Sequence, residues 1–257
     1  MIHTTVILAM SADGKITDCA LTAARFGSAN DKSHLEQQVA ASDAVLFGNG
    51  TLRAYGTTLR VISPDLLEQR KLQGKPPQPV QIVCSRSRQF DPNWRFFDQP
   101  VPRWLLTGQD SRDTALPSPL SSSLGCSPLG GGRGGLTSSF FPLPLMFDRT
   151  LIANTIAGEI DWIDSFQQLE TLGIKRLAIL GGGKLVASVL AAGLIDELWL
   201  TVCPLILGGA DAPTPVEGKG FLADLAPKLE LLAVKQVGGE VFLHYRVDRS
   251  QSQNTHK

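Results

Sequence analysis

An apolar run that passes directly into three glycines and then into a helical pattern constrains the fold of this chain most. Leu177 to Leu180 reads as a buried strand, Gly181 to Gly183 as a tight turn, and Lys184 to Ala192 as a helix that ends at Gly193. A buried strand followed at once by a helix is the unit from which parallel α/β sheets are built. The sequence therefore predicts a mostly parallel sheet flanked by helices.

The same turn is suited to a phosphate group. Glycines let a phosphate approach the backbone, and the first turn of a helix presents free N–H groups and a positive dipole end. The turn is not a Walker A loop, because Leu185 stands where Ser or Thr binds magnesium. It is not a G-x-G-x-x-G turn either, because Val186 replaces the last glycine. Two interpretations stay open: a binding site for a dinucleotide pyrophosphate, or a turn without a ligand.

Other segments extend the alternation of strands and helices. Strands are predicted over residues 4–10, 44–48, 80–85, 104–107, 151–153 and 198–202. Helices are predicted over 31–41, with Asn30 as the N-cap, and over 165–172, with Gly173 as the stop. The chain closes with a hairpin over 229–236 and 241–245 around Gly238-Gly239, which adds an antiparallel edge. We predict one α/β domain over residues 1–248.

Two segments fall outside this pattern. Residues 117–144 are dense in Ser, Gly, Pro and Leu without periodicity, so we expect a flexible insertion between two strands. The polar residues 249–257 are expected to form a disordered tail. Cys84 and Cys203 lie in apolar runs, which favours buried free thiols.

Charge and composition argue against several classes of function. The chain has 24 basic and 24 acidic residues, and a formal net charge of zero argues against binding to nucleic acid or to an anionic membrane. No apolar run reaches the length of a membrane span, and the first residues lack the basic start of a signal peptide. The histidines and cysteines show no metal-ligand spacing, and there is no G-x-S-x-G elbow. We expect a cytoplasmic protein that binds a small molecule and no metal.

Three further motifs follow predicted strands, where open α/β sheets bind ligands. Gly48-Asn49-Gly50-Thr51 offers glycines and a hydroxyl, and a helix-capping turn is the alternative. Ser85 and Arg86 belong to a run of hydroxyl and guanidinium groups that would hold a ribose 2′-phosphate and favour NADPH over NADH. A solvated basic loop is the alternative there. Ser11-Ala12-Asp13-Gly14-Lys15 follows the first strand, and a plain turn is its alternative.

In this order, the motifs resemble the reductase domain of the bifunctional riboflavin-biosynthesis deaminase/reductase. The family landmarks stand here as residues 11–15, 43–51, Ser85, 181–184, 194–198 and 204–208. The resemblance implies a dihydrofolate-reductase-like fold, usually a homodimer. It also implies reduction by NADPH of the ribosyl group of 5-amino-6-(5-phosphoribosylamino)uracil to a ribityl chain. The deaminase signature H-x-E with P-C-x-x-C is absent, so we expect a stand-alone reductase.

For the cofactor, the resemblance implies contacts at Thr51, Ser85 and from Gly183 through the start of the helix; the other candidates below come from the motifs themselves and from nearby cations. NADPH is expected to contact Gly50, Thr51, Ser85, Arg86, Gly181, Gly182, Gly183, Lys184 and Leu185. The phosphoribosyl substrate is expected to contact Ser11, Arg25, Asn49, Leu59 and Arg60. Lys15 and Asp13 are the candidates for electrostatic help in catalysis.

The substrate side departs from the family pattern at four positions. Val39 stands for an arginine, Tyr55 for an acid, Gly181 for a glutamate and Arg25 for a tryptophan. The substrate phosphate still needs a cation, and we choose Arg60 as the replacement. Three hypotheses follow: this reductase, a reductase of the same fold acting on a pterin or another small heterocycle, and a nucleotide-binding protein without catalysis.

Overall fold

The computed structural model describes residues 1–109 and 146–248 of the chain. Its main strands are β1 His3–Ser11, β2 Ala44–Gly48, β3 Val80–Cys84, β4 Arg103–Gly108, β5 Arg149–Ala153, β8 Arg176–Ile179, β9 Glu197–Cys203, β10 Lys228–Val237 and β11 Glu240–Asp248. Its helices are α1 Ala29–Ala41, α2 Asn49–Tyr55, α3 Pro64–Leu72, α5 Trp162–Thr171 and α6 Gly183–Ala191, with a 3₁₀ helix at Arg95–Asp98. A small separate hairpin comprises β6 Thr155–Ile156 and β7 Glu159–Ile160.

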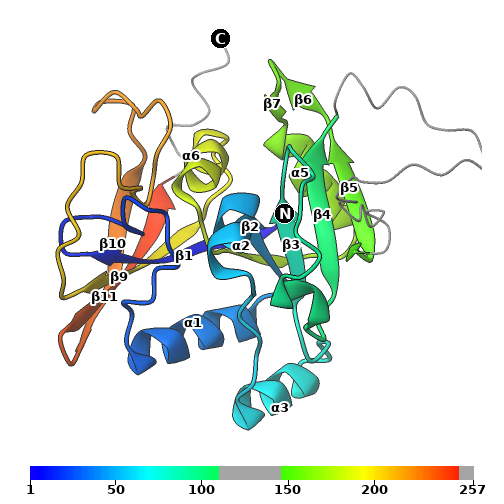
Figure 1. The fold of residues 1–257 in the computed structure, drawn as a ribbon, viewed down its shortest axis with the longest axis horizontal. Helices are drawn as coiled ribbons and strands as arrows, with labels where there is room; N and C mark the ends of the chain where they lie inside the picture. Colours follow the sequence, from blue (N-terminus) through cyan, green and yellow to red (C-terminus); the bar gives the residue numbers. More distant parts are fainter. Residues whose placement is uncertain (110–145, 249–257) are drawn as a thin grey trace, which may run out of the picture.

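The nine main strands form one sheet in the order β10-β11-β9-β1-β8-β2-β3-β4-β5 (Figure 1). From β9 to β5 every neighbouring pair is parallel. At the other edge β11 pairs antiparallel with both β9 and β10. The predicted mostly parallel sheet with an antiparallel C-terminal hairpin is therefore confirmed.

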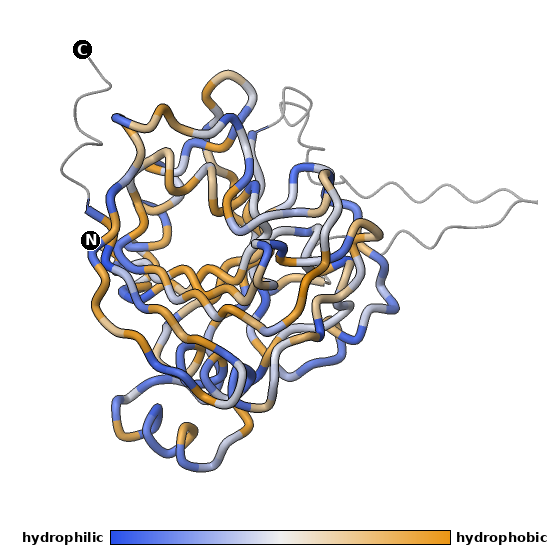
Figure 2. Tube along the Cα trace, turned by 90° about the vertical axis from the view of Figure 1, so that its left-hand side faces the viewer, coloured by the Kyte–Doolittle hydropathy of each residue, from blue (hydrophilic) through white to orange (hydrophobic). Residues whose placement is uncertain are grey.

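Helices cover both faces of this sheet (Figure 1). On one face Leu169 of α5 and Val189 of α6 pack with strand residues such as Leu46. On the other face Val39 of α1 packs with strand residues such as Phe47. Hydrophobic residues accordingly run along the strands through the middle of the molecule (Figure 2). Burial on both faces explains why the central strands are continuously apolar rather than alternating.

The helix after β1 begins earlier than predicted, and its cap is Ser28 rather than Asn30. The Ser28 hydroxyl oxygen accepts hydrogen bonds from the N–H groups of Asn30 and Asp31. The Glu240 carboxylate holds Ser28 in place, because it accepts from the Ser28 N–H at 2.7 Å and from its hydroxyl at 2.5 Å. The Asn30 prediction was wrong because Glu240, a partner distant in sequence, orients the serine.

Helices α2 and α3 and the β6–β7 hairpin were not predicted from the sequence. Gly50 made the start of α2 read as a loop. For α3 a signal was present, since Ser63 and Pro64 stand at the N-cap and first helical positions. The predicted insertion over 117–144 and the predicted tail over 249–257 lie outside the described residues.

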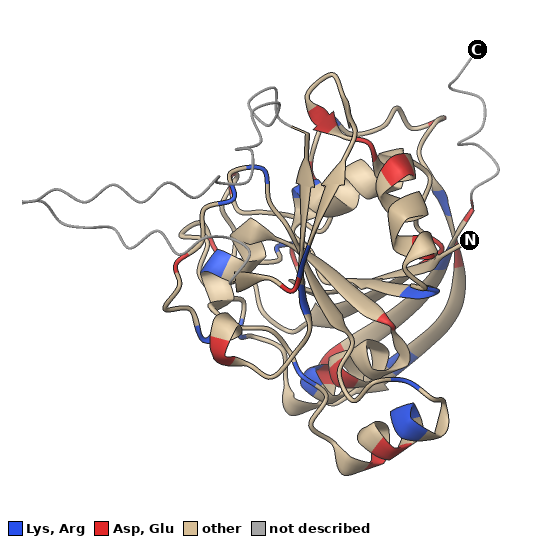
Figure 3. Cartoon of the chain, turned by 90° about the vertical axis from the view of Figure 1, so that its right-hand side faces the viewer, with Lys and Arg blue, Asp and Glu red and all other residues tan. Residues whose placement is uncertain are grey.

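Further features of the fold are the cysteines, the helix lengths and the surface charges. In the described part of the chain, Cys19, Cys84 and Cys203 are free thiols, with Cys203 fully buried and Cys84 partly so. No helix there is long and apolar enough to cross a membrane. Basic and acidic residues are interspersed on the side of the molecule shown in Figure 3.

Candidate active site

The four sequence motifs meet at one edge of the sheet. Strands β1, β8, β2 and β3 are consecutive and parallel, so their carboxyl ends lie together. The loops that leave these ends carry Ser11 to Lys15, the glycine loop Gly181–Gly183, Asn49 to Thr51, and Ser85 with Arg86. Ligands in open α/β sheets bind at this edge.

The glycine loop lies directly against the turn that follows β2. The Gly48 N–H donates to the Gly181 carbonyl oxygen at 3.1 Å. A Cβ atom added at Gly182 would lie 3.7 Å from Thr51 Oγ1. The peptide bond between Gly181 and Gly182 is cis. Two of the predicted cofactor motifs are thus neighbours in space.

The three glycines of the loop differ in backbone conformation and in the space around them. Gly181 has a φ of +99°, and a Cβ there would lie 3.2 Å from a Leu8 methyl carbon. At Gly183 a Cβ would collide with the Thr214 carbonyl oxygen, at 2.3 Å. Gly182 is extended, at φ −76° and ψ 175°, and has no such close neighbour. The fold therefore requires glycine at 181 and 183, whereas Gly182 leaves free space beside Thr51.

The start of α6 presents uncapped N–H groups, and the Glu217 side chain lies beside its first residue, Gly183. Gly182 is its N-cap residue and no side chain caps it. The first N–H groups of a helix have no partner within the helix, so those of Gly183, Lys184 and Leu185 are suited to bind a phosphate. Lys184 is exposed and Leu185 is buried.

The motif after β1 is held by contacts to a distant loop. Ser11 is buried; its hydroxyl donates to Asp13 Oδ1 at 2.6 Å and accepts from the Lys15 N–H at 2.9 Å. The Asp13 carboxylate also accepts from the N–H groups of Leu207 and Gly208. These bonds, that from Ser11 foremost, lower the pKa of Asp13 to about 2.

The lysine of the same motif points into this network as well. Lys15 Nζ donates to the Ala212 carbonyl oxygen at 3.1 Å. The loop that Asp13 and Lys15 hold, residues 205–217, reaches the glycine loop, because the Glu217 N–H donates to the Gly183 carbonyl oxygen at 3.2 Å. This loop was not predicted to belong to the site. Its beginning, Pro204 to Gly208, was a landmark of the resemblance and would have pointed to it.

Beside β3, Ser85 and Arg86 lie in different surroundings. Ser85 is buried, and its hydroxyl accepts from the Arg88 N–H at 3.2 Å. Arg86 Nη1 lies 2.8 Å from Glu159 Oε1 in an ion pair whose two side chains are largely exposed. Arg88 Nε donates to Thr107 Oγ1 at 3.2 Å. Arg88, the second guanidinium group of the predicted 2′-phosphate run, is therefore fixed over the strand ends, whereas Arg86 extends toward the β6–β7 hairpin.

Two of the altered substrate positions have structural roles. Val39 is fully buried in the core between α1 and the sheet. The Tyr55 hydroxyl donates to the Ala24 carbonyl oxygen at 2.8 Å, and burial raises the pKa of this phenol. Arg25 is exposed. Its positive charge lowers the pKa of Tyr55, against the effect of burial, so Arg25 lies near Tyr55 at the end of α2.

The predicted contacts Leu59 and Arg60 lie further from the glycine loop. Leu59 packs against the core cluster beneath α1. The N–H and carbonyl oxygen of Val61, next to Arg60, are both bonded to Gln78, which precedes β3. The backbone at Arg60 thus runs toward the amino-terminal edge of the sheet, and the structure does not bring it to the strand ends that carry the other motifs.

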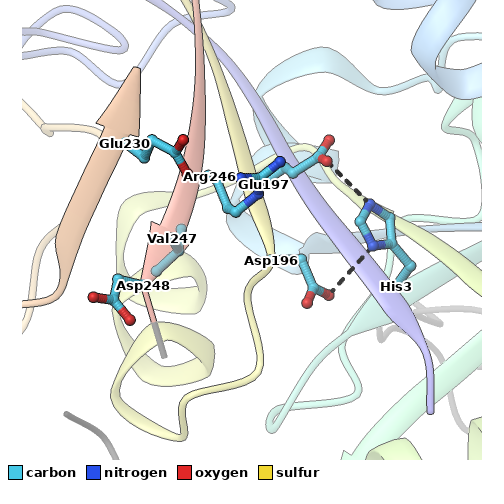
Figure 4. A pocket seen from close by; sticks show the side chains of 7 residues that line it. All are labelled: His3, Asp196, Glu197, Glu230, Arg246, Val247 and Asp248. Carbon is cyan, nitrogen blue, oxygen red and sulfur yellow. Dashed lines mark hydrogen bonds and ion pairs between the residues drawn. The ribbon is translucent and has the colours of Figure 1, made fainter. Parts of the chain in front are cut away.

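A groove at that opposite edge holds a cluster of charged side chains (Figure 4). Its volume is about 440 Å³, and His3 lies between Asp196, at 3.8 Å, and Glu197, at 3.6 Å. Arg246 on the neighbouring wall pairs with Glu230 at 2.7 Å. These charged groups bond one another, far from the glycine loop.

The fold and its glycine-lined edge define an α/β protein suited to binding a dinucleotide. The chain belongs to the RibD C-terminal domain family, whose model matches residues 3–243. The chain is therefore a reductase of riboflavin biosynthesis, an oxidoreductase, and reductases of this family call for a nicotinamide cofactor.

Individual relatives agree with this family. A 2,5-diamino-6-ribosylamino-4(3H)-pyrimidinone 5′-phosphate reductase of Archaeoglobus fulgidus is 29% identical over 84% of this chain and 87% of its own length. The riboflavin biosynthesis protein RibD of Escherichia coli is 28% identical, and the match covers 80% of this chain and 49% of that protein. A pyrimidine reductase-like protein of Corynebacterium diphtheriae has the same fold, with a TM-score of 0.73 at 21% identity over 96% of this chain and 92% of that one.

Proposed function

We propose that this chain uses NADPH to reduce the ribosyl group of 5-amino-6-(5-phosphoribosylamino)uracil to a ribityl chain. One observation carries the cofactor assignment: the uncapped start of α6, with its glycine loop, lies beside Thr51 at the carboxyl edge of the sheet. That arrangement suits a dinucleotide pyrophosphate on residues 181–185. Ser85 and Arg86 follow β3, where they would favour the 2′-phosphate of NADPH.

The proposed reaction reduces the C1′=N bond of the ring-opened sugar. C1′ gains a hydride and the nitrogen gains a proton, while NADPH becomes NADP⁺. NADPH supplies the hydride, so the chain's own residues would bind and orient the reactants. The low pKa of Asp13 keeps its carboxylate ionised at neutral pH, so Asp13 does not supply the proton.

A second substrate is favoured by one specific finding. The Archaeoglobus relative, 87% of whose length matches this chain, is named for a 2,5-diaminopyrimidinone. That compound still carries the amino group that the uracil lacks. We keep this compound as the alternative, and both are phosphoribosylaminopyrimidines. A pterin reductase and a non-catalytic nucleotide-binding protein are no longer needed as explanations, because the chain is a riboflavin-pathway reductase.

The test is NADPH oxidation by the purified protein with each pyrimidine in parallel, and with dihydrofolate as a control. We expect turnover with the uracil and none with dihydrofolate. Turnover with the diaminopyrimidinone alone would replace the first substrate by the second. Turnover with NADH but not with NADPH would overturn the cofactor assignment.

We further propose that the protein acts as a homodimer. The edge strand β10 exposes the apolar side chains of Leu229, Leu231 and Val234, each about half accessible. An exposed apolar edge strand favours pairing with another surface. Light scattering on the purified protein would show twice the chain mass, and a monomer would reject the proposal. The cytoplasmic location stays a prediction from the sequence.

A further inference from the structure

Asn49 carries a buried acceptor to which the described residues supply no donor. Only 9% of Asn49 is exposed. Its Nδ2 donates to the Gln89 carbonyl oxygen at 3.2 Å, whereas Oδ1 has no hydrogen-bond partner within residues 1–109 and 146–248. Gln99 is equally buried, yet Thr57 and Thr58 bond both ends of its amide. Because an unpaired buried acceptor is costly, the bare oxygen of Asn49 indicates a group that binds there.

The orientation of the Asn49 amide follows from its one partner. A carbonyl oxygen such as that of Gln89 only accepts hydrogen bonds, so the nitrogen of the amide must face it. The amide oxygen consequently faces the other way and requires a donor. An incoming hydroxyl or N–H group would satisfy it, whereas a phosphate oxygen would not.

The sheet order places Asn49 between the two proposed phosphate sites of the cofactor. Strand β2 lies between β8, which leads into the glycine loop, and β3, which leads to Ser85. Asn49 is the first residue after β2. A cofactor with its pyrophosphate on the glycine loop and its 2′-phosphate near Ser85 therefore carries its adenosine ribose across the end of β2. The 2′ oxygen of that ribose bears the phosphate, which leaves the 3′-hydroxyl as the donor on the sugar.

We propose that Asn49 Oδ1 accepts a hydrogen bond from the 3′-hydroxyl of the adenosine ribose of NADPH. The assignment rests on the proposed cofactor binding, and it makes Asn49 a cofactor contact instead of the substrate contact expected from the sequence.

The experiment measures affinity by calorimetry for NADPH and for an NADPH analogue that lacks the 3′-hydroxyl. The proteins are the wild type, Asn49→Ala and the matched control Gln99→Ala. We expect the wild type to bind NADPH about three- to tenfold more tightly than the analogue, which is the range of one neutral hydrogen bond. Asn49→Ala should bind both ligands equally and weakly, and Gln99→Ala should keep the wild-type ratio.

Thermal unfolding without ligand separates a binding role from a structural one. Asn49→Ala loses its one hydrogen bond, to Gln89, together with an unpaired acceptor, so its melting temperature should change little; Gln99→Ala should melt clearly lower because it leaves the backbone groups of Thr58 unpaired. Equal affinities of the wild type for the two ligands would overturn the proposal, and this comparison needs no variant. A ratio that persists in Asn49→Ala would overturn it too. Absence of any NADPH binding by the wild type would instead reject the proposed function on which this inference rests.

Discussion

The carboxylate of Asp13 accepts a hydrogen bond from the Gly208 N–H at 2.7 Å, although 195 positions separate the two residues in the chain. The Leu207 N–H and the Ser11 hydroxyl complete the set of donors. The bond ties the loop after β1 to the loop after β9, which in turn contacts Gly183. Asp13 thus positions the loop that borders the glycine loop.

The pH dependence of stability should report this carboxylate. The pKa of Asp13 is lowered from 3.8 to about 2 in the folded chain. A lowered pKa contributes stability above the unfolded value, and this contribution is lost as the pH falls from about 4 toward 2. Asp13→Asn should therefore melt below the wild type at pH 7, and the difference should shrink toward pH 2. A difference in melting temperature that does not vary with pH would mean that the charge is not responsible.

The sequence located this motif but not its role. Ser11, Asp13 and Lys15 could be recognised from the sequence because they are closely spaced polar residues directly after an apolar strand. Their partners, Leu207, Gly208 and Ala212, offer backbone groups, which almost every residue type can supply. The roles of Asp13 and Lys15 in positioning therefore required the structure, and their predicted electrostatic help in catalysis stays a prediction.

The glycine loop gives a test with an internal control. Gly182→Val should fold normally, since beyond its chain neighbours the nearest atom to an added Cβ is Thr51 Oγ1, at 3.7 Å, but it should abolish NADPH binding by filling the space beside Thr51. Gly183→Ala should instead destabilise the fold by about 1–3 kcal/mol, because its methyl group meets the Thr214 carbonyl oxygen at 2.3 Å. Calorimetry and thermal unfolding of both variants check this. Unchanged NADPH affinity in Gly182→Val would show that the loop is only a turn.

Arg86 should set the preference for NADPH over NADH, and its ion pair with Glu159 offers a way to vary that effect. Arg86→Ala should narrow the affinity ratio of the two cofactors by roughly tenfold to a hundredfold, the range of one charged contact. Glu159→Gln removes the competing carboxylate at 2.8 Å and should widen the ratio slightly. If Arg86→Ala leaves the ratio unaltered, Arg86 is not in the site, and the same measurement on Arg88→Ala is then decisive.

The thiols should differ in reactivity. Burial raises the pKa of Cys84 and of Cys203 to about 12, and only the thiolate is nucleophilic. Iodoacetamide at pH 7.5 should therefore modify exposed Cys19 in the native protein and leave Cys84 and Cys203 intact. Peptide mass spectrometry would locate the label, and a denatured sample is the control. Labelling of Cys203 in the native state would show that the β9 end opens to solvent.

Most of the sheet was predictable because its strands are buried on both faces and hence continuously apolar. What escaped prediction lies where the local signal conflicts with tertiary contacts. Gly50 favours a loop by residue type, yet it lies within α2. Leu52 of that helix is fully buried in the core. Asn30 is a good cap by type, yet Ser28 is chosen because Glu240 binds it. Such preferences depend on residues that are distant in the chain.

Two arginines compete for the role of the cation that binds the substrate phosphate. Arg60 was chosen from the sequence, but its neighbour Val61 is bonded to Gln78 before β3, toward the amino-terminal edge of the sheet. Arg25 is exposed and lies near Tyr55, which ends the helix that begins with the Asn49 turn. The structure therefore gives Arg25 the better position, although Arg60 remains the prediction to be tested first.

Kinetics of Arg60→Ala and Arg25→Ala with the phosphoribosylaminouracil separate the two arginines. Loss of one charge-assisted phosphate contact should lower kcat/KM by roughly 10- to 100-fold and leave NADPH affinity unchanged. A substrate analogue without the phosphate gives the second measurement, because the variant that has lost the contact should handle this analogue as the wild type does. Wild-type kinetics in Arg60→Ala together with a loss in Arg25→Ala would transfer the role to Arg25. Wild-type kinetics in both variants would mean that the phosphate is bound by backbone N–H groups or by another cation, because a dianion held by either arginine cannot lose that partner without a penalty in kcat/KM.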